Sequence, residues 1–273
     1  MDTELLHDYP WDELDFNLLP PAIRKVRGML TGREKAMLYW IALRAYEAEG
    51  LILDQGCFLG GSTVCFAAGL RSRGLAKPLI HSYDRFVLGD FEREHYFADG
   101  APPDDRFRPL YDENLAGYRD LVTVHEGDML AQTWPGDPIE ILFVDIAKTS
   151  AVWDHVVASF FTSLIPRRSL LILQDYLFEH SGPWHHVVME KLANHFELVG
   201  DTEKNSMLFA YVGGLTAGEI QEARWDHIAM HDRVELMDRA IAKLDTQEKR
   251  ELLANVRAAL VEEDLGSTRP DPR

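Results

Sequence analysis

The chain has 273 residues, 46% of them apolar, and a formal net charge of −17. This length suits one large domain or one domain with an appendage. Such an excess of negative charge repels nucleic acid and anionic lipid, so we expect neither as a partner. We also expect a cytoplasmic protein without a membrane partner, because no apolar stretch could span a bilayer and the acidic start does not resemble a signal peptide.

The first predicted elements are an arm, a helix and the start of an alternating pattern. Residues 1–32 are mixed and contain prolines, and we expect an N-terminal arm or lid over the core. Apolar side chains at near-helical spacing predict a helix over residues 33–49, which Gly50 ends. The pattern then predicts strand 51–54, helix 61–71, strand 78–83, helix 105–118 and strand 121–125.

The alternation continues with strand 139–144, helix 150–164, strand 169–174 and helix 184–195. Strand 139–144 is apolar except for Glu140 near its start. Runs 196–200 and 206–212 can pair as a closing hairpin, which puts an antiparallel strand at or near one edge. Strands that alternate with helices form a mainly parallel sheet covered on both faces. Residues 33–214 are therefore predicted to form an α/β domain with a doubly wound sheet.

Residues 215–273 are predicted to form a C-terminal helical appendage with two helices in residues 216–264. A helical pair must bury its apolar face, so we expect it to pack on the core or on a second copy, with the protein a homodimer. The apolar positions include Ile220, Ala223, Ile228, Val234, Leu236, Met237, Ile241, Leu244, Leu252, Leu253, Val256 and Leu260. The two cysteines, Cys57 and Cys65, are interpreted as small apolar fillers.

The turn "DQGCFLGGST" between the first strand and the next helix contains Gly56, Gly60, Gly61 and Ser62. Its glycine spacing is neither G-x-G-x-x-G nor a P-loop, which disfavours nicotinamide dinucleotides and nucleoside triphosphates. S-adenosylmethionine is the remaining common ligand. Gly56 and Gly60 would let this cofactor approach the backbone, and Ser62 could give its hydroxyl and N–H to the methionine carboxylate. The alternative is a tight turn without a ligand.

Two more acidic residues follow strands. Asp84 ends the second strand, where its carboxylate could accept both ribose hydroxyls of the cofactor. Asp128, in "HEGD" after the third strand, could accept the adenine amino group. A solvated loop residue and a turn residue are the respective alternatives. Two signals at successive strand ends strengthen the cofactor hypothesis, because ligands of open α/β sheets bind at these ends.

The segments "DQGCFLGGST", "YDRF", "HEGD", "FVDIAK" and "LQDY" together resemble the class I S-adenosylmethionine-dependent methyltransferases. Within them, the chain is similar to O-methyltransferases of the catechol and caffeoyl-coenzyme A type and of the macrolide-sugar type, over about residues 33–212. The resemblance implies a seven-stranded Rossmann-like sheet and places Phe58 on the family's aromatic cofactor position. It implies O-methylation of a small hydroxylated acceptor, with a sugar or glycosylated natural product favoured.

The metal-dependent members of this family hold Mg²⁺ with carboxylates at strand ends. Asp145 and Asp175 follow two strands that should be neighbours, and Lys148 matches the position of the catechol-type general base. One ligand is lost, because Gln174 and Tyr176 stand where the two family patterns have an acidic residue or Asn. The sequence therefore leaves open both a magnesium site at Asp145 and Asp175 and a metal-free reaction with Asp145 or a histidine as base.

Other candidates lie near the same edge of the sheet. His180, His185 and His186 follow the fifth strand, and most of them are interpreted as surface or capping residues. Residues 85–109 form a long, aromatic-rich connection that suits a lid or an acceptor pocket, or a satellite core. A non-catalytic protein of the same fold, acting as a binding or assembly partner, is the alternative function.

Overall fold

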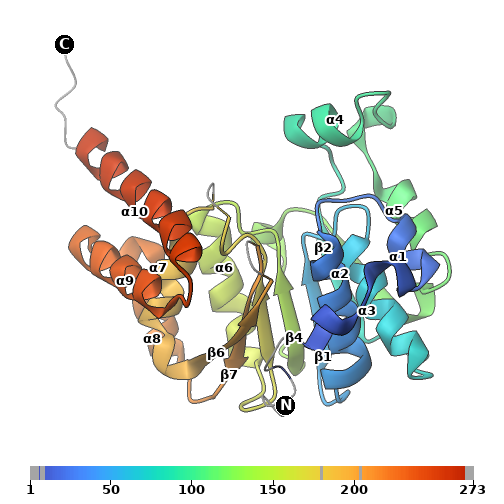
Figure 1. The fold of residues 1–273 in the computed structure, drawn as a ribbon, viewed down its shortest axis with the longest axis horizontal. Coiled ribbons are helices and arrows are strands. Elements are labelled where there is room, and N and C mark those ends of the chain that lie inside the picture. The colour runs from blue at the N-terminus through green and yellow to red at the C-terminus, as the bar shows by residue number, and fades with distance from the viewer. Residues whose placement is uncertain (1–5, 7–9, 179–180, 203–204, 268–273) are drawn as a thin grey trace.

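A computed structural model describes residue 6 and residues 10–178, 181–202 and 205–267 of the chain. A seven-stranded sheet forms its centre (Figure 1). The strands are β1 (Leu51–Gln55), β2 (Ile80–Asp84), β3 (Val122–Glu126), β4 (Ile139–Val144), β5 (Leu170–Leu173), β6 (Phe196–Asp201) and β7 (Met207–Tyr211). Each of the seven predicted strands is present, with ends that differ by at most two residues.

The strand order is β3-β2-β1-β4-β5-β7-β6. Strands β1 to β5 pair in parallel, whereas β7 is antiparallel to both β5 and β6. This confirms a doubly wound, mainly parallel sheet with an antiparallel strand next to one edge. The strand order reverses between β1 and β4, and ligands of such sheets bind in the crevice at this point.

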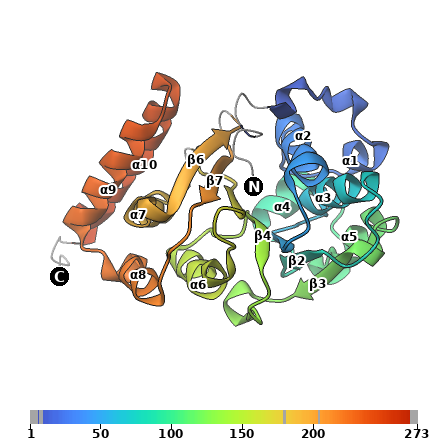
Figure 2. The same ribbon diagram turned by 90° about the horizontal axis from the view of Figure 1, so that it is seen from below.

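Helices cover both faces of the sheet (Figure 2), as its doubly wound class predicts. The helices are α1 (Pro21–Lys25), α2 (Gly32–Trp40), α3 (Gly61–Ser72), α4 (Asp90–Tyr96), α5 (Arg108–Asn114), α6 (Ser150–Phe160), α7 (Trp184–Lys191), α8 (Ala217–Glu222), α9 (Met230–Lys243) and α10 (Gln247–Ser267). One apolar core lies between the sheet and α1, α2, α3 and α5, and the other lies under α6 to α10.

Some predicted helices are wrong in extent. The helix expected over residues 33–49 is α2, which begins after a Thr31–Glu34 capping box and passes into a π-helical turn at Ile41–Ala45. The helix expected over residues 105–118 is only α5, because Asp104 and Asp105 have φ values of 54° and 57° that no α-helix contains. The described part of the appendage, residues 215–267, holds three α-helices instead of two.

Strand β4 is buried along its whole length, including Glu140. The Glu140 carboxylate accepts hydrogen bonds from the backbone N–H groups of Glu47, Glu49 and Gly50 at 2.5–3.1 Å. These bonds replace water around a buried charge. The one charged residue of the strand thus holds the loop that leads into β1.

The arm and the appendage both pack on the central domain. Trp11 and Ile23 of the arm are fully buried in the first core, and α8, α9 and α10 bury their apolar faces in the second. Lys249 of α10 ties the appendage to the sheet through Asp201 at the end of β6, at 2.6 Å. The apolar face of the appendage is thus covered by the central domain of the same chain. The homodimer stays a prediction, which the mass of the protein in solution would test. None of the described helices combines the length and apolar character that crossing a membrane requires.

Candidate active site

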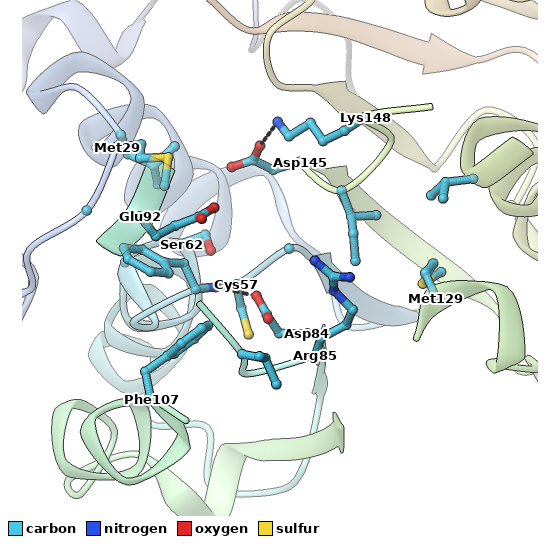
Figure 3. A pocket seen from close by; sticks show the side chains of 18 of the residues that line it. Met29, Cys57, Ser62, Asp84, Arg85, Glu92, Phe107, Met129, Asp145 and Lys148 are labelled. Atoms are coloured by element: carbon cyan, nitrogen blue, oxygen red, sulfur yellow. Dashed lines mark hydrogen bonds and ion pairs between the residues drawn. The ribbon is translucent and has the colours of Figure 1, made fainter. Parts of the chain in front are cut away.

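A cavity of about 450 Å³ opens at the carboxyl ends of β1, β2 and β4, beside the strand-order reversal (Figure 3). Its size is that of ordinary cofactor and substrate sites. The predicted site residues that line it are Gly56, Phe58, Ser62, Asp84, Asp128, Asp145 and Lys148. Gly60 and Asp175 do not line it, although both lie next to residues that do.

The glycines of the first turn are required by the protein's own packing. Gly56 has φ +91°, and a Cβ there would lie 2.7 Å from the Asp145 carbonyl oxygen. Gly60 has φ +88°, and a Cβ there would lie 2.5 Å from the Leu115 side chain of the segment after α5. A Cβ on Gly61 would meet only Leu30, at 3.9 Å, so Gly61 is the glycine of this turn that leaves its space to the cavity.

The Ser62 hydroxyl points into the protein. It donates to the Asp54 carboxylate at 2.8 Å, and Thr63 donates to the same carboxylate at 2.5 Å. The Ser62 hydroxyl is therefore engaged within the protein, and its contact with a cofactor carboxylate stays a prediction. No side chain caps the start of α3, so the first N–H groups of this helix have no intrahelical partner and can attract an anion.

Asp54 is a site-supporting residue that the sequence analysis missed. Its side chain is fully buried, and burial raises the pKa of its carboxyl to about 6 although the two hydroxyls lower it. The signal for it was present, because a carboxylate inside the apolar run of β1 precedes two hydroxyl residues at the start of the next helix. Asp54 fixes the first turn of α3 relative to β1.

Asp84 links the ends of β1 and β2. Its two carboxylate oxygens accept the backbone N–H groups of Phe58 and Phe86, each at 2.8 Å. Burial raises the pKa of the Asp84 carboxyl, while these bonds oppose the shift. The Phe58 ring packs edge-on against Tyr96 and Phe107, at centroid distances of 5.5 and 5.1 Å. The aromatic connection after β2 therefore joins the first apolar core, instead of forming a separate satellite core, and also borders the cavity.

Asp128 follows β3 and has the turn role weighed for it, while its contact with the adenine amino group stays a prediction. Its carboxylate accepts the Leu130 N–H at 2.9 Å and so caps the short 3₁₀ helix Met129–Ala131. The same residue lines the cavity. Its carboxylate is accordingly open to a ligand, because each carboxylate oxygen accepts more than one hydrogen bond.

Asp145, Lys148 and Asp175 converge as predicted, since β4 and β5 are neighbours. The Lys148 ammonium lies 2.8 Å from Asp145 Oδ1 and 2.6 Å from Asp175 Oδ2. Desolvation of the ammonium between the two carboxylates lowers the pKa of Lys148, although 61% of its side chain is exposed, but attraction to both carboxylates outweighs this and the pKa is raised overall. Burial also raises the pKa of Asp145, to about 7, against the opposing effect of Lys148. The general base predicted at Lys148 is thus a stably charged ammonium.

These residues do not fit a magnesium site. No cluster of three His, Cys, Asp or Glu side chains suited to a metal ion occurs in the described part of the chain. Tyr176, at the lost ligand position, is 4% exposed and packs against His186 and Phe209 beneath the site. Gln174 is also buried. The ligand set is limited to two carboxylates that already hold an ammonium.

The histidines after β5 differ from the expectation. His185 and His186 are buried instead of surface or capping residues, with exposures of 6% and 0%. They face apart as expected: His185 packs on Trp153, whereas His186 contacts the Tyr176 carbonyl oxygen at 2.7 Å. Burial lowers the pKa of both imidazoles. His180 lies outside the described residues.

The arm contributes lining residues that the sequence analysis missed. Met29 and Leu30 border the cavity, as does Lys35 at the start of α2. Lys35 is 6% exposed and donates to the Val26 carbonyl oxygen at 2.8 Å, and burial lowers its pKa. Lys35 could have been recognised from the sequence, because it is a charged residue on the side of the helix that faces the core. Arg85 reaches into the cavity from the end of β2 (Figure 3).

Neither a protein-family model nor a curated protein matches the chain. Among solved structures, the O-methyltransferase NovP matches with a TM-score of 0.52 and 14% identity, over 66% of this chain and 80% of NovP. CalS11, a TDP-rhamnose 3'-O-methyltransferase, matches with a TM-score of 0.46 and 17% identity, over 66% of this chain and 78% of CalS11.

Phosphoethanolamine N-methyltransferase 1 of Haemonchus contortus was solved with phosphoethanolamine and S-adenosylhomocysteine. It matches with a TM-score of 0.48 and 9% identity, over 93% of this chain and 59% of the N-methyltransferase. At these identities the similarities show the fold alone. The strand order and the match to NovP agree with the resemblance noted from sequence: the chain has the Rossmann-like fold of the class I methyltransferases.

Proposed function

We propose that this chain is an S-adenosylmethionine-dependent O-methyltransferase that acts on a small hydroxylated molecule. The observation that carries the proposal is the cavity at the strand-order reversal, which the uncapped start of α3 and the carboxylates of Asp84 and Asp145 border together. The methyltransferase fold supports it. The glycine spacing of the first turn argues against a nicotinamide enzyme.

The lining residues fit this cofactor. The free N–H groups at the start of α3 would hold the methionine carboxylate, aided by the helix dipole. Asp84 would accept the ribose hydroxyls, because each of its oxygens uses one acceptor position for a backbone N–H and keeps another. Asp128 would accept the adenine amino group. When bound, the cofactor supplies a methyl group on a sulfonium, which an acceptor oxygen can take.

Asp145 is the favoured base. It lines the cavity, and a carboxylate whose pKa is near 7 can accept a proton from a hydroxyl at neutral pH. Lys148 stays charged and would stabilise negative charge on the acceptor oxygen as the proton leaves. This assignment follows the metal-free alternative, with Lys148 in an electrostatic role.

A sugar or glycosylated acceptor is the favoured substrate class. The cavity combines charged groups that can bond hydroxyls, such as Arg85 and Asp128, with exposed apolar side chains at its mouth. Met29, Val87 and Leu130 are 40%, 40% and 49% exposed. Sugar rings present both hydroxyls and apolar faces, so a lining of this mixed kind suits them.

Titration calorimetry with S-adenosylhomocysteine tests the proposal. The full chain should bind it, and should not bind NAD or ATP. Asp84→Ala should weaken binding by about 1.5–3 kcal/mol, the usual contribution of hydrogen bonds to a charged group. Asp120→Ala, which removes a carboxylate from a surface pair with Arg71, is the control and should bind like the wild type.

Because Asp84 also holds two backbone N–H groups, each variant's melting temperature should be recorded with its affinity. Unchanged affinity in a folded Asp84→Ala protein would remove the ribose assignment, and binding of NAD alone would end the proposal. A non-catalytic member of the fold is the second candidate, favoured by the ammonium that already engages Asp145 and Asp175. Cofactor binding without methyl transfer to a panel of sugars and phenols would favour that candidate.

A further inference from the structure

The space between Asp145 and Asp175 is already occupied by a positive charge. The Lys148 ammonium contacts one carboxylate oxygen of each residue, at 2.8 and 2.6 Å. We infer that this ammonium is the resident cation of the site, so that the methyl transfer proposed above requires no divalent metal. The charge effect on the reaction rests on the proposed function, whereas the cation's position rests on the geometry alone.

The backbone that carries Lys148 is held on both sides. The Lys148 N–H donates to the Ile146 carbonyl oxygen at 2.8 Å, and the Trp184 indole N–H donates to the Ala147 carbonyl oxygen at 3.0 Å. On the other side, Thr149 caps helix α6 by accepting the N–H of its third residue. These three bonds fix the backbone from which the Lys148 side chain reaches the two carboxylates.

A divalent ion would have to displace this ammonium for little gain. Mg²⁺ takes six oxygen ligands and gives up its water reluctantly. The protein offers it two carboxylates, because Tyr176 is buried beneath the site against His186. An ammonium needs no octahedral set, and its donors are satisfied by the two carboxylates together with water, since 61% of the Lys148 side chain is exposed.

The positive charge stands where it can act on the reaction. Asp145 and Lys148 both line the cavity, and their ion pair faces it (Figure 3). An ammonium at this place can offset the charge of an acceptor oxygen that loses its proton, which is the service a metal ion would give. Lys148 is therefore a fixed, single-charged substitute for a divalent cation.

The test uses Mn²⁺ as a spectroscopic probe on the chelator-treated full chain, with free Mn²⁺ measured by electron paramagnetic resonance. The wild type should have no Mn²⁺ site at Asp145 and Asp175, so Asp175→Asn alone should leave its Mn²⁺ binding unchanged. Lys148→Met should gain a site, because two carboxylates then face one empty space, and adding Asp175→Asn should remove it. Lys77→Met, which makes the same change of net charge at an exposed lysine, is the matched control and should gain nothing.

Wild-type binding of Mn²⁺ that Asp175→Asn abolishes would overturn the inference. If neither the wild type nor Lys148→Met binds the ion, the melting temperatures decide. The melting temperature of Lys148→Met should then be lower than that of Lys77→Met. The difference should grow from mild acid to alkaline pH, because the two carboxylates become charged. Equal melting temperatures would overturn the inference. S-adenosylhomocysteine affinity, measured on the same samples, reports separately on the proposed function.

Discussion

Exchange of Asp54 for asparagine should change how the stability of the protein depends on pH. The folded-state pKa of this buried carboxyl is about 6, against an ordinary value of 3.8. The folded protein therefore binds the proton more tightly than the unfolded chain does. Below pH 3.8 both states are protonated, and as pH rises toward 6 the unfolded chain loses its proton first, so stability falls.

The magnitude follows from the distance between the two pKa values. Each pH unit is equivalent to about 1.4 kcal/mol, which makes the loss about 3 kcal/mol between mild acid and neutral pH. An asparagine side chain cannot titrate, so the difference in unfolding free energy between wild type and Asp54→Asn should shift by this amount in favour of the variant as pH rises. Thr63→Val, which removes a donor to the same carboxylate, should enlarge the loss of stability and extend it to higher pH, because that bond lowers the folded-state pKa.

Urea denaturation of wild type and variant at several pH values between mild acid and neutrality measures this difference. Other titrating groups cancel in the comparison, because both proteins contain them. A difference that stays constant with pH would refute the argument. A shift of opposite sign would mean that the two hydroxyls outweigh burial and hold Asp54 charged.

Two further predictions concern packing and the appendage. Gly56→Ala should lower the unfolding free energy by about 2 kcal/mol or more, because its Cβ would meet the Asp145 carbonyl oxygen at 2.7 Å in a left-handed conformation. Gly61→Ala has open space and should keep wild-type stability in the same denaturation assay while weakening S-adenosylhomocysteine binding; equal losses in both variants would contradict this. Lys249→Met should destabilise the full chain by more than about 1 kcal/mol, because it removes the ammonium that lies 2.6 Å from the buried Asp201 carboxylate at the end of β6. Arg239→Ala, at an exposed ion pair, should cost under about 1 kcal/mol, and similar losses for the two would show that burial does not matter there.

The order of the strands and helices could be predicted from sequence because the signals are local. Alternating apolar runs and turn residues identify β1 to β7, and Gly56 marks the turn after β1 at the strand-order reversal. The same local pattern predicted that Asp145 and Asp175 would meet, since consecutive parallel units place their strand ends together. Local signals failed where one chain segment depends on another, as at the start of α5.

Side-chain orientation in the site could not be predicted in this way. The Ser62 hydroxyl points inward because a buried carboxylate competes for it, and the pattern of glycines says nothing about that partner. Gly60 is needed because Leu115, more than fifty positions later, packs against it. The family resemblance places a base at Lys148, yet the ammonium is held by Asp145 and by Asp175 after the next strand.

Acidic side chains lie at the carboxyl ends of three adjacent strands, where the fold leaves them little exposed to solvent. Burial raises the pKa of Asp54 near the end of β1, of Asp84 at the end of β2 and of Asp145 after β4. Backbone N–H groups, hydroxyls and the ammonium of Lys148 only partly offset this. A ligand that brings positive charge close to Asp84 or Asp145 would offset part of the desolvation penalty of these carboxylates, and the sulfonium of the proposed cofactor carries such a charge.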